Sequence, residues 1–273
     1  MKKFTFDDKQ YQIKCLLGIG SQAAVFKCFS DYDQKTVTCR VFLEDFDELV
    51  KERQYYQLQQ QQIKRQYIQY CLRFHKIIIQ QTPTSTITNR TAILQILEFG
   101  DYKLTDQNMN INFDLKMKLV YQMAIAINDV HKHNLIHRDI KPDNIYLTEK
   151  MDVLLSDFGI ARKNDQSLKT KIGTISYAAP EVWLTVKETD EKDFARYGYE
   201  VDIWSFGCVI YYLVTDDDLF DGVNVEHYDE RIEETKLEKI QPEFLELILQ
   251  LVVIDIGQRK QNWEKLKNHF QLK

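Results

Sequence analysis

HRDIKPDN, residues 137–144, carries the polar side chains on which the fold prediction rests. Asp139 and Asn144 lie five positions apart, on a turn that contains Pro142, whose nitrogen cannot donate a backbone hydrogen bond. A polar turn capped by Asp and Asn is the ordinary explanation for such residues. Because the carboxylate, the lysine and the amide all occupy fixed places in one short stretch, a site of chemistry is favoured instead.

DVLLSDFG, residues 152–159, adds another carboxylate a few positions along the chain. Asp157 ends a strand-like apolar run and stands directly before Phe158 and Gly159. A carboxylate in this place suits a hard cation such as Mg²⁺, which prefers one or two carboxylates together with phosphate oxygens. The stretch therefore predicts a metal ligand at Asp157.

LGIGSQAAVF, residues 17–26, places Gly18 and Gly20 between two expected strands. Glycine lets the backbone turn sharply and lets N–H groups approach phosphate oxygens closely. Taken alone, a Gly-x-Gly pair in a hairpin is more often only a turn.

Composition and charge exclude several classes of protein. At 273 residues the chain can hold one large domain or two packed lobes, and its net charge of −5 argues against a nucleic-acid binder. The start, MKKFTFDDKQ, has no apolar run, and no stretch is long enough to span a bilayer. The five cysteines show no C-x-x-C pair. We therefore expect buried free thiols in a soluble intracellular protein, cytoplasmic or nuclear.

The hydrophobic pattern changes along the chain. Strand-like runs fill most of the first third, at 11–17, 24–29, 36–42, 70–79 and 91–99, with one helix expected at 45–62. Stripes of helical spacing follow at 115–130, 203–213 and 244–252. This shift predicts two lobes joined near residues 98–100.

In chain order, these motifs resemble the signature set of the eukaryotic protein kinases of the serine/threonine type. The matching positions are Gly18-x-Gly20 with Val25, a strand-borne cation at position 40, HRDIKPDN, Asp157-Phe158-Gly159, Ala179-Pro180-Glu181, VDIWSFG (201–207) and Arg259. The resemblance implies a bilobal α+β fold. Residues 1–99 would form a β-rich, nucleotide-binding N-lobe with one main helix, and residues 100–273 a larger α-helical C-lobe.

The resemblance also implies a reaction, the transfer of the ATP γ-phosphate to Ser or Thr hydroxyls of protein substrates. Asp139 would accept or orient the hydroxyl proton, and Lys141 would contact the transferring phosphate. Asn144 and Asp157 would hold Mg²⁺ against the ATP phosphates. Lys141 and Thr174 match the serine/threonine kinases rather than the tyrosine kinases.

The nucleotide contacts implied for the N-lobe are Gly18, Gly20, Val25, Arg40, Glu52, Glu98 and Gly100. Leu97 would be the gatekeeper, and the backbone of Glu98 and Gly100 would face the adenine edge. Without the other motifs, the run LQILEFG fits an ordinary buried strand that ends in a turn.

Two further pairings follow from the resemblance. Thr170 has the spacing of an activating phosphosite, modified by another kinase or by autophosphorylation, and Arg138 would pair with its phosphate. Glu181 and Arg259 would form an ion pair, although surface positions are the commoner fate of both residue types.

Position 40 departs from the family, which has lysine there. Arginine keeps the charge but presents a longer, planar fork with a different reach. Its expected carboxylate partner is Glu52, and Glu48 stays open because the interval from residue 40 to residue 52 is short for the family. Either glutamate could instead be a solvated helix residue.

Other departures are Ala23, in place of the third loop glycine, and Tyr146, where a smaller residue usually floors the adenine site. The alternative to an active, slowed kinase is therefore a pseudokinase, a binding or scaffolding module that holds ATP without using it.

Overall fold

The computed structural model describes residues 3–6, 8–19, 23–42, 71–79, 90–106, 111–158, 162–163, 175–187, 197–236 and 238–272. These residues form two compact units, one up to Asp101 and the other from Tyr102 onward. The helix expected at 45–62 lies outside the described residues. Together the units give the α+β fold that the sequence predicts.

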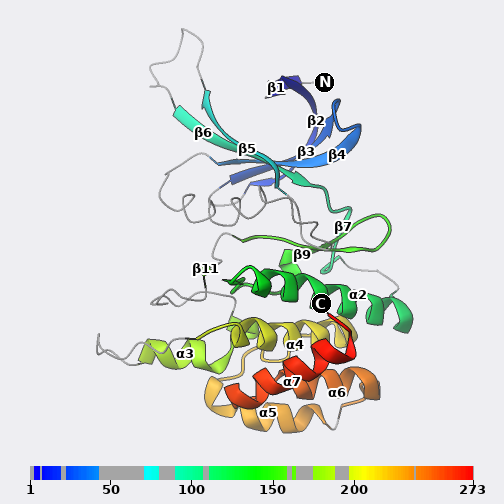
Figure 1. Cartoon of the computed structure of the whole chain (residues 1–273), viewed down its shortest axis with the longest axis vertical. Coiled ribbons are helices and arrows are strands. Elements are labelled where there is room, and N and C mark those ends of the chain that lie inside the picture. Colours follow the sequence, from blue (N-terminus) through cyan, green and yellow to red (C-terminus); the bar gives the residue numbers. More distant parts are fainter. Residues whose placement is uncertain are drawn as a thin grey trace. The chain divides into compact units, whose positions relative to one another are not determined.

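The first unit is an antiparallel sheet of six strands (Figure 1). The strands are β1 (Lys3–Phe6), β2 (Lys9–Ile19), β3 (Ala23–Ser30), β4 (Lys35–Phe42), β5 (Cys71–Ile79) and β6 (Arg90–Glu98), in the spatial order β1-β2-β3-β4-β6-β5. Five of them confirm the strands predicted from the hydrophobic pattern, and β1 was not predicted.

One face of this sheet holds a small hydrophobic core. Five side chains there are almost fully buried: Tyr11, Cys28, Val37, Cys39 and Ile96. They alternate along their strands with residues of the opposite face, as the two-residue period of a strand requires. The sheet therefore has a second face that is free to carry polar residues.

The cysteine prediction is only partly correct. Cys28, Cys39 and Cys208 are buried free thiols. Cys15 is also free but exposed, because it lies in the second half of β2, where the side chains from Cys15 to Ile19 are all exposed.

The second unit is mainly helical (Figure 1). Its helices are α2 (Phe113–Lys132), α3 (Pro180–Lys187), α4 (Glu200–Thr215), α5 (Tyr228–Thr235), α6 (Pro242–Leu251) and α7 (Ile256–His269). Short strands form two small sheets: β10 (Val153–Leu155), β9 (Ile145–Leu147) and β7 (Tyr102–Lys103) in one, and β11 (Arg162–Lys163) with β8 (Leu135–Ile136) in the other. Helices α2, α4 and α6 confirm the three predicted stripes.

Helix α4 lies at the centre of this unit. Every residue from Glu200 to Tyr211 is buried, and the helix contacts α2, α6 and α7. A helix that is apolar all round is stable only when it is enclosed in this way. Near its start the ring of Trp204 stacks on Phe220 and Tyr228, with centroid separations of 5.3 and 5.8 Å.

Arg259 on α7 fixes the start of α4 and of α3. Its guanidinium donates to both carboxylate oxygens of Glu181, at 2.6 and 3.2 Å, and to the Glu200 carbonyl oxygen at 3.1 Å. Both side chains of the ion pair are buried. This confirms the predicted pair, and the two-point geometry satisfies charges that would be costly if left alone.

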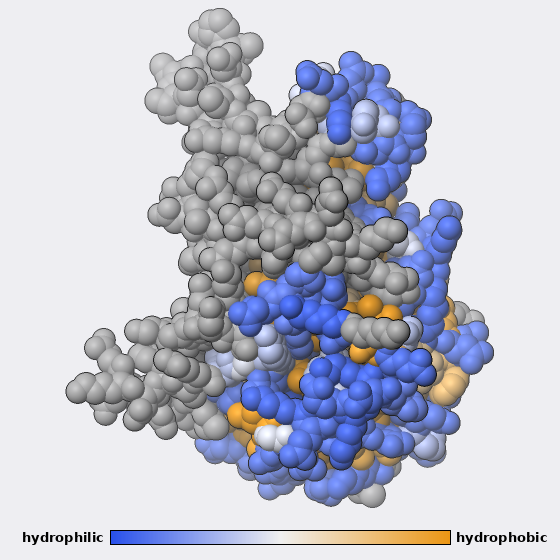
Figure 2. Space-filling view, in the orientation of Figure 1, coloured by the Kyte–Doolittle hydropathy of each residue, from blue (hydrophilic) through white to orange (hydrophobic). Residues whose placement is uncertain are grey.

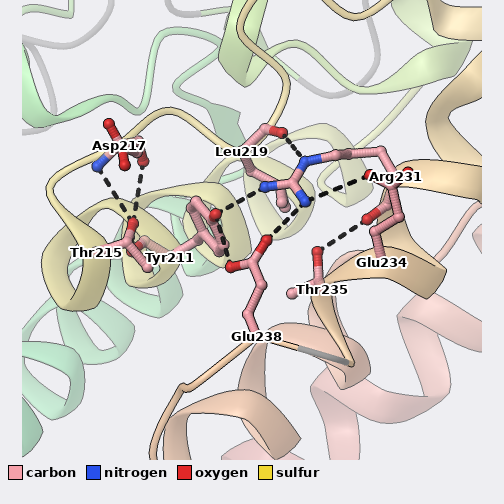
Figure 3. A network of polar contacts seen from close by, with 8 residues as sticks. All are labelled: Tyr211, Thr215, Asp217, Leu219, Arg231, Glu234, Thr235 and Glu238. Atoms are coloured by element: carbon pink, nitrogen blue, oxygen red, sulfur yellow. Dashed lines mark hydrogen bonds and ion pairs between the residues drawn. The ribbon is translucent and has the colours of Figure 1, made fainter.

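Arg231 on α5 fixes the other end of α4 (Figure 3). Its guanidinium donates to the Leu219 carbonyl oxygen at 2.9 Å, to the Tyr211 hydroxyl at 2.7 Å and to Glu238 at 2.6 Å. Tyr211 in turn donates to the second oxygen of Glu238 at 2.8 Å. The closed ring of contacts ties the last turns of α4 to α5.

The visible surface agrees with this arrangement. In Figure 2 the described residues are mostly hydrophilic, and the hydrophobic ones show only as small separate patches. Among the helices of the described ranges, none is both long and apolar enough to cross a bilayer.

Gly207 gives a direct test of how tightly α4 is packed. A Cβ added there would lie 2.6 Å from Val252 Cγ2 and 3.0 Å from Leu251 Cβ. We expect Gly207→Ala to lower the free energy of unfolding by about 1–3 kcal/mol, because overpacking forces neighbouring helices apart. Urea denaturation measures the change. Gly257→Ala, in α7, is the control, since a Cβ there would come no closer than 3.3 Å to a neighbouring atom, the Asp255 carboxylate oxygen.

Candidate active site

Asp139, Lys141 and Asn144 meet at one carboxylate. Lys141 Nζ lies 3.0 Å from Asp139 Oδ2. Asn144 Nδ2 donates to the same oxygen and to the main-chain oxygen of Asp139, each at 2.8 Å. The structure thus brings together the three residues that were predicted to be catalytic.

The local sequence explains this geometry. Pro142 opens the 3₁₀ turn η1 (Pro142–Asn144), where its missing N–H costs no hydrogen bond. The turn closes through a hydrogen bond from Asn144 N to the Lys141 carbonyl oxygen at 3.0 Å. The chain therefore doubles back, and the Asn144 amide returns to the Asp139 carboxylate.

Asp157 is brought beside Asn144 by the β9–β10 hairpin. The strands pair antiparallel from Ile145 opposite Leu155 to Leu147 opposite Val153. Beyond the pairing, Ser156 donates to the Asn144 carbonyl oxygen from both its N and its Oγ, at 2.9 and 3.0 Å. The two predicted metal ligands thus lie on adjoining segments.

His137 contacts the residues on both sides of Asp157. It is fully buried, and its Nε2 is 2.9 Å from the Ser156 carbonyl oxygen. Its ring also meets the ring of Phe158 edge-on at 4.5 Å. The position of Asp157, between Ser156 and Phe158, is therefore fixed on both sides by one histidine.

Arg138 and Asp157 have strained backbones. Their φ angles are +72° and +61°, a left-handed region that non-glycine residues seldom adopt. Such strain costs on the order of 1–3 kcal/mol per residue and persists only where surrounding contacts impose it.

Asp202 on α4 supplies those contacts for the strained Arg138. Its two oxygens accept hydrogen bonds from the backbone N–H groups of His137 and Arg138, each at 2.8 Å. His131 on α2 adds a third, from Nε2 at 2.9 Å. Asp202 is fully buried. Burial alone would raise its pKa, but the hydrogen bonds and charge of His131 and the backbone N–H of Arg138 outweigh it, so the pKa lies below the usual value.

The side chain of Arg138 is held in place by Tyr197. Nη2 of Arg138 donates to the Tyr197 hydroxyl at 2.8 Å, and both residues are buried. The predicted phosphosite, Thr170, lies outside the described residues. The pairing of Arg138 with a phosphorylated loop therefore stays a prediction.

In the sheet unit, three predicted nucleotide contacts form one row. Gly18 of β2 pairs with Val25 of β3, and Val25 pairs with Arg40 of β4. Directly opposite residues of antiparallel strands point to the same face, so Val25 and Arg40 lie on the face opposite the hydrophobic core. The next member of the row is Gln95 of β6, which pairs with Arg40.

The remaining predicted contacts are placed only in part. Glu98 is the last residue of β6, paired with Val37, and Gly100 follows two residues later. Gly20, Glu52 and Glu48 lie outside the described residues, as do Gly159 and Thr174. The carboxylate partner predicted for Arg40 thus remains untested.

The comparison with protein families decides the identity of the fold. The family model described as Protein kinase domain matches residues 11–270. The chain belongs to the protein kinase family. Its members use ATP and, in general, Mg²⁺.

Curated relatives of this kinase domain carry kinase names. The mitogen-activated protein kinase mpkC of Neosartorya fischeri is 29% identical over 214 residues, 77% of this chain and 52% of that protein. The serine/threonine-protein kinase nekl-2 of Caenorhabditis elegans is 34% identical over 165 residues, 55% of this chain and 44% of that protein. This chain therefore spans about half the length of the curated relatives it matches.

The donor set of the kinase domain fits Mg²⁺. Asn144 Nδ2 faces Asp139, and the Asn144 amide oxygen and the Asp157 carboxylate would be the two oxygen ligands of the ion. Among the described residues, no group of three or more His, Cys, Asp or Glu side chains could hold a metal without help. Mg²⁺ ordinarily takes its other ligands from phosphate and water.

The sheet unit likewise fits a phosphate group. A Cβ placed on Gly18 would meet no described heavy atom within 4 Å, so the backbone at the Gly-rich stretch is open to close approach. Arg40, in the same row of the sheet, supplies a permanent positive charge.

Sequence reasoning missed Asp202, His131 and Gln95. Asp202 lies within VDIWSFG, which was recognised as a motif, but its contact with residues 137 and 138 spans more than 60 positions. Gln95 carried a usable signal, since a lone polar residue in the apolar run AILQILEF requires a buried partner.

Asp202 yields a pH prediction. A carboxylate whose pKa is lowered by folding adds stability above its unfolded value, 3.8, and loses that contribution as the pH falls through the folded pKa. We expect Asp202→Asn to be less stable than the wild type at neutral pH, with the difference shrinking below about pH 4. Urea denaturation across pH 3–7 measures it. A stability difference that is independent of pH would contradict the assignment.

Proposed function

We propose that this chain is a protein serine/threonine kinase that transfers the γ-phosphate of ATP to Ser or Thr hydroxyls of protein substrates, with Mg²⁺. The observation that carries the proposal is the convergence of Lys141 and Asn144 on the carboxylate of Asp139. A scaffold has no physical need for this arrangement, whereas phosphoryl transfer depends on alignment and neutralised charge.

Each residue of the cluster has a distinct task in the proposal. Asp139 accepts the proton of the substrate hydroxyl while the hydroxyl oxygen of the substrate forms a bond to the γ-phosphorus. The bond from that phosphorus to the bridging oxygen of ATP breaks, and ADP leaves. Lys141 offsets charge on the transferring group and holds the Asp139 carboxylate in place. Asn144 and Asp157 hold Mg²⁺, which neutralises phosphate charge when bound.

The substrate class rests on Lys141 and on the relatives. Lysine at this position resembles serine/threonine kinases, and the relative nekl-2 is named a serine/threonine-protein kinase. The N-lobe contacts for ATP would come from Gly18, Val25 and Arg40 in one row of the sheet.

Asp139→Asn tests the enzyme proposal. The substitution removes the proton acceptor but keeps the shape, so we expect phosphate transfer to casein with Mg²⁺ATP to fall by roughly 10²–10⁴-fold. Asp143→Asn is the matched control, because Asp143 lies in the same turn but is exposed and forms an ion pair with Lys103, at 3.0 Å. Equal transfer by the wild type and Asp139→Asn would instead identify a pseudokinase.

Arg40 should limit the rate without abolishing it. Arginine preserves the charge that the family lysine supplies, but its planar fork has a different reach. We expect Arg40→Lys to raise kcat/KM for ATP several-fold, and Arg40→Ala to lower it by about a hundredfold, the usual cost of one well-placed electrostatic contact. Steady-state kinetics at varied ATP measures both. A fall in Arg40→Lys would show that the arginine is the better residue in this protein.

A further inference from the structure

We propose that Gln95 is a positioning residue that holds the guanidinium of Arg40 for the nucleotide phosphates. The inference rests on the proposed function, because it concerns the same nucleotide site. It adds a residue to that site and explains how arginine works at a position where the family has lysine.

The register of the sheet places the two side chains together. Arg40 of β4 stands directly opposite Gln95 of β6. Directly opposite residues in an antiparallel pair have Cβ atoms about 4.5–5.5 Å apart and share one face of the sheet. Long side chains at that separation are within reach of each other.

Alternation along the strands confirms the shared face. Cys39 and Ile96 both belong to the hydrophobic core of the sheet, and Val41 packs against it. Their neighbours Arg40 and Gln95 therefore point to the opposite face. On that face the row Gly18, Val25, Arg40, Gln95 crosses four strands and ends at Gln95.

Burial makes the pairing energetically important. Only 3% of the surface of Gln95 is exposed, and Arg40 is half-buried. A buried amide is costly unless it forms hydrogen bonds, and a guanidinium brings five N–H donors in a fixed plane. Gln95 Oε1 is buried and accepts no hydrogen bond from any described residue, and the guanidinium opposite can donate to it through one edge while the other edge remains available to an anion.

The neutral amide is the suitable partner for this task. A carboxylate at position 95 would orient the guanidinium but would also neutralise it, in competition with phosphate. An aliphatic side chain would leave the planar fork without orientation. Lysine needs no such partner, because its ammonium is a compact point charge with rotatable donors.

A double-mutant cycle tests the inference with four proteins: the wild type, Gln95→Leu, Arg40→Lys and the double variant. Calorimetric titration with Mg²⁺ATP gives the affinity, and kinetics gives KM for ATP separately from kcat. We expect Gln95→Leu alone to weaken ATP binding about tenfold, as for a lost hydrogen bond to a charged group, with kcat changed little. In the Arg40→Lys background the same change should cost less than about twofold.

Gln95→Glu separates positioning from packing. An ion pair with Arg40 would keep the sheet stable in urea denaturation, yet ATP binding should weaken more than in Gln95→Leu. If Gln95 were only a packing residue, the buried carboxylate of Gln95→Glu would lower the free energy of unfolding. The affinity for ATP would then change in parallel with the free energy of unfolding in every variant. Gln10→Leu, on the exposed side of β2 in the same sheet, is the control for a glutamine-to-leucine change.

The possible results are distinct. Equal effects of Gln95→Leu in the two backgrounds would overturn the positioning role, whatever the transfer activity. Coupled ATP affinities with no phosphate transfer by any protein would uphold it and reject the proposed kinase activity. Absence of ATP binding by all four proteins would overturn both.

Discussion

The carboxylate of Asp202 is the contact on which the geometry of the candidate site depends. Two backbone N–H groups, those of His137 and Arg138, and the Nε2 of His131 all point at its two oxygens. This set of hydrogen bonds keeps Arg138 at φ +72°, a conformation it would leave if the acceptor were removed. The next residue is Asp139, the proposed base. Its backbone orientation is therefore set by the buried carboxylate of Asp202, which lies on α4.

Asp202 can do this because packing and polar contacts hold α4 in place. The helix is enclosed by its neighbours, and salt bridges or hydrogen bonds fix both ends: Arg259 at its start and Arg231 near its end. The charge of Asp202 would be costly in such surroundings without three donors. Packing and polar contacts are thus mutually dependent, since each would be unstable without the other.

The sheet unit follows a different principle. There, register rather than a buried anion aligns the residues, because directly opposite positions on neighbouring strands must face the same way. A row that starts at the Gly-rich stretch and crosses Val25 and Arg40 reaches Gln95. The proposed contact then explains two unusual residues together: the arginine at position 40, where the family has lysine, and the polar residue at position 95.

The amino-acid sequence was enough to predict the family, five of the six strands of the sheet and the helices α2, α4 and α6, because hydrophobic period and motif spacing are local properties of the chain. It also indicated Asp139, Lys141, Asn144 and Asp157, which lie no more than 18 positions apart. Only the tertiary structure revealed Asp202, His131 and the pairing of Arg40 with Gln95. These contacts join segments tens of residues apart, and the folded chain alone, through the burial of α4 and the register of the sheet, determines which distant polar groups meet.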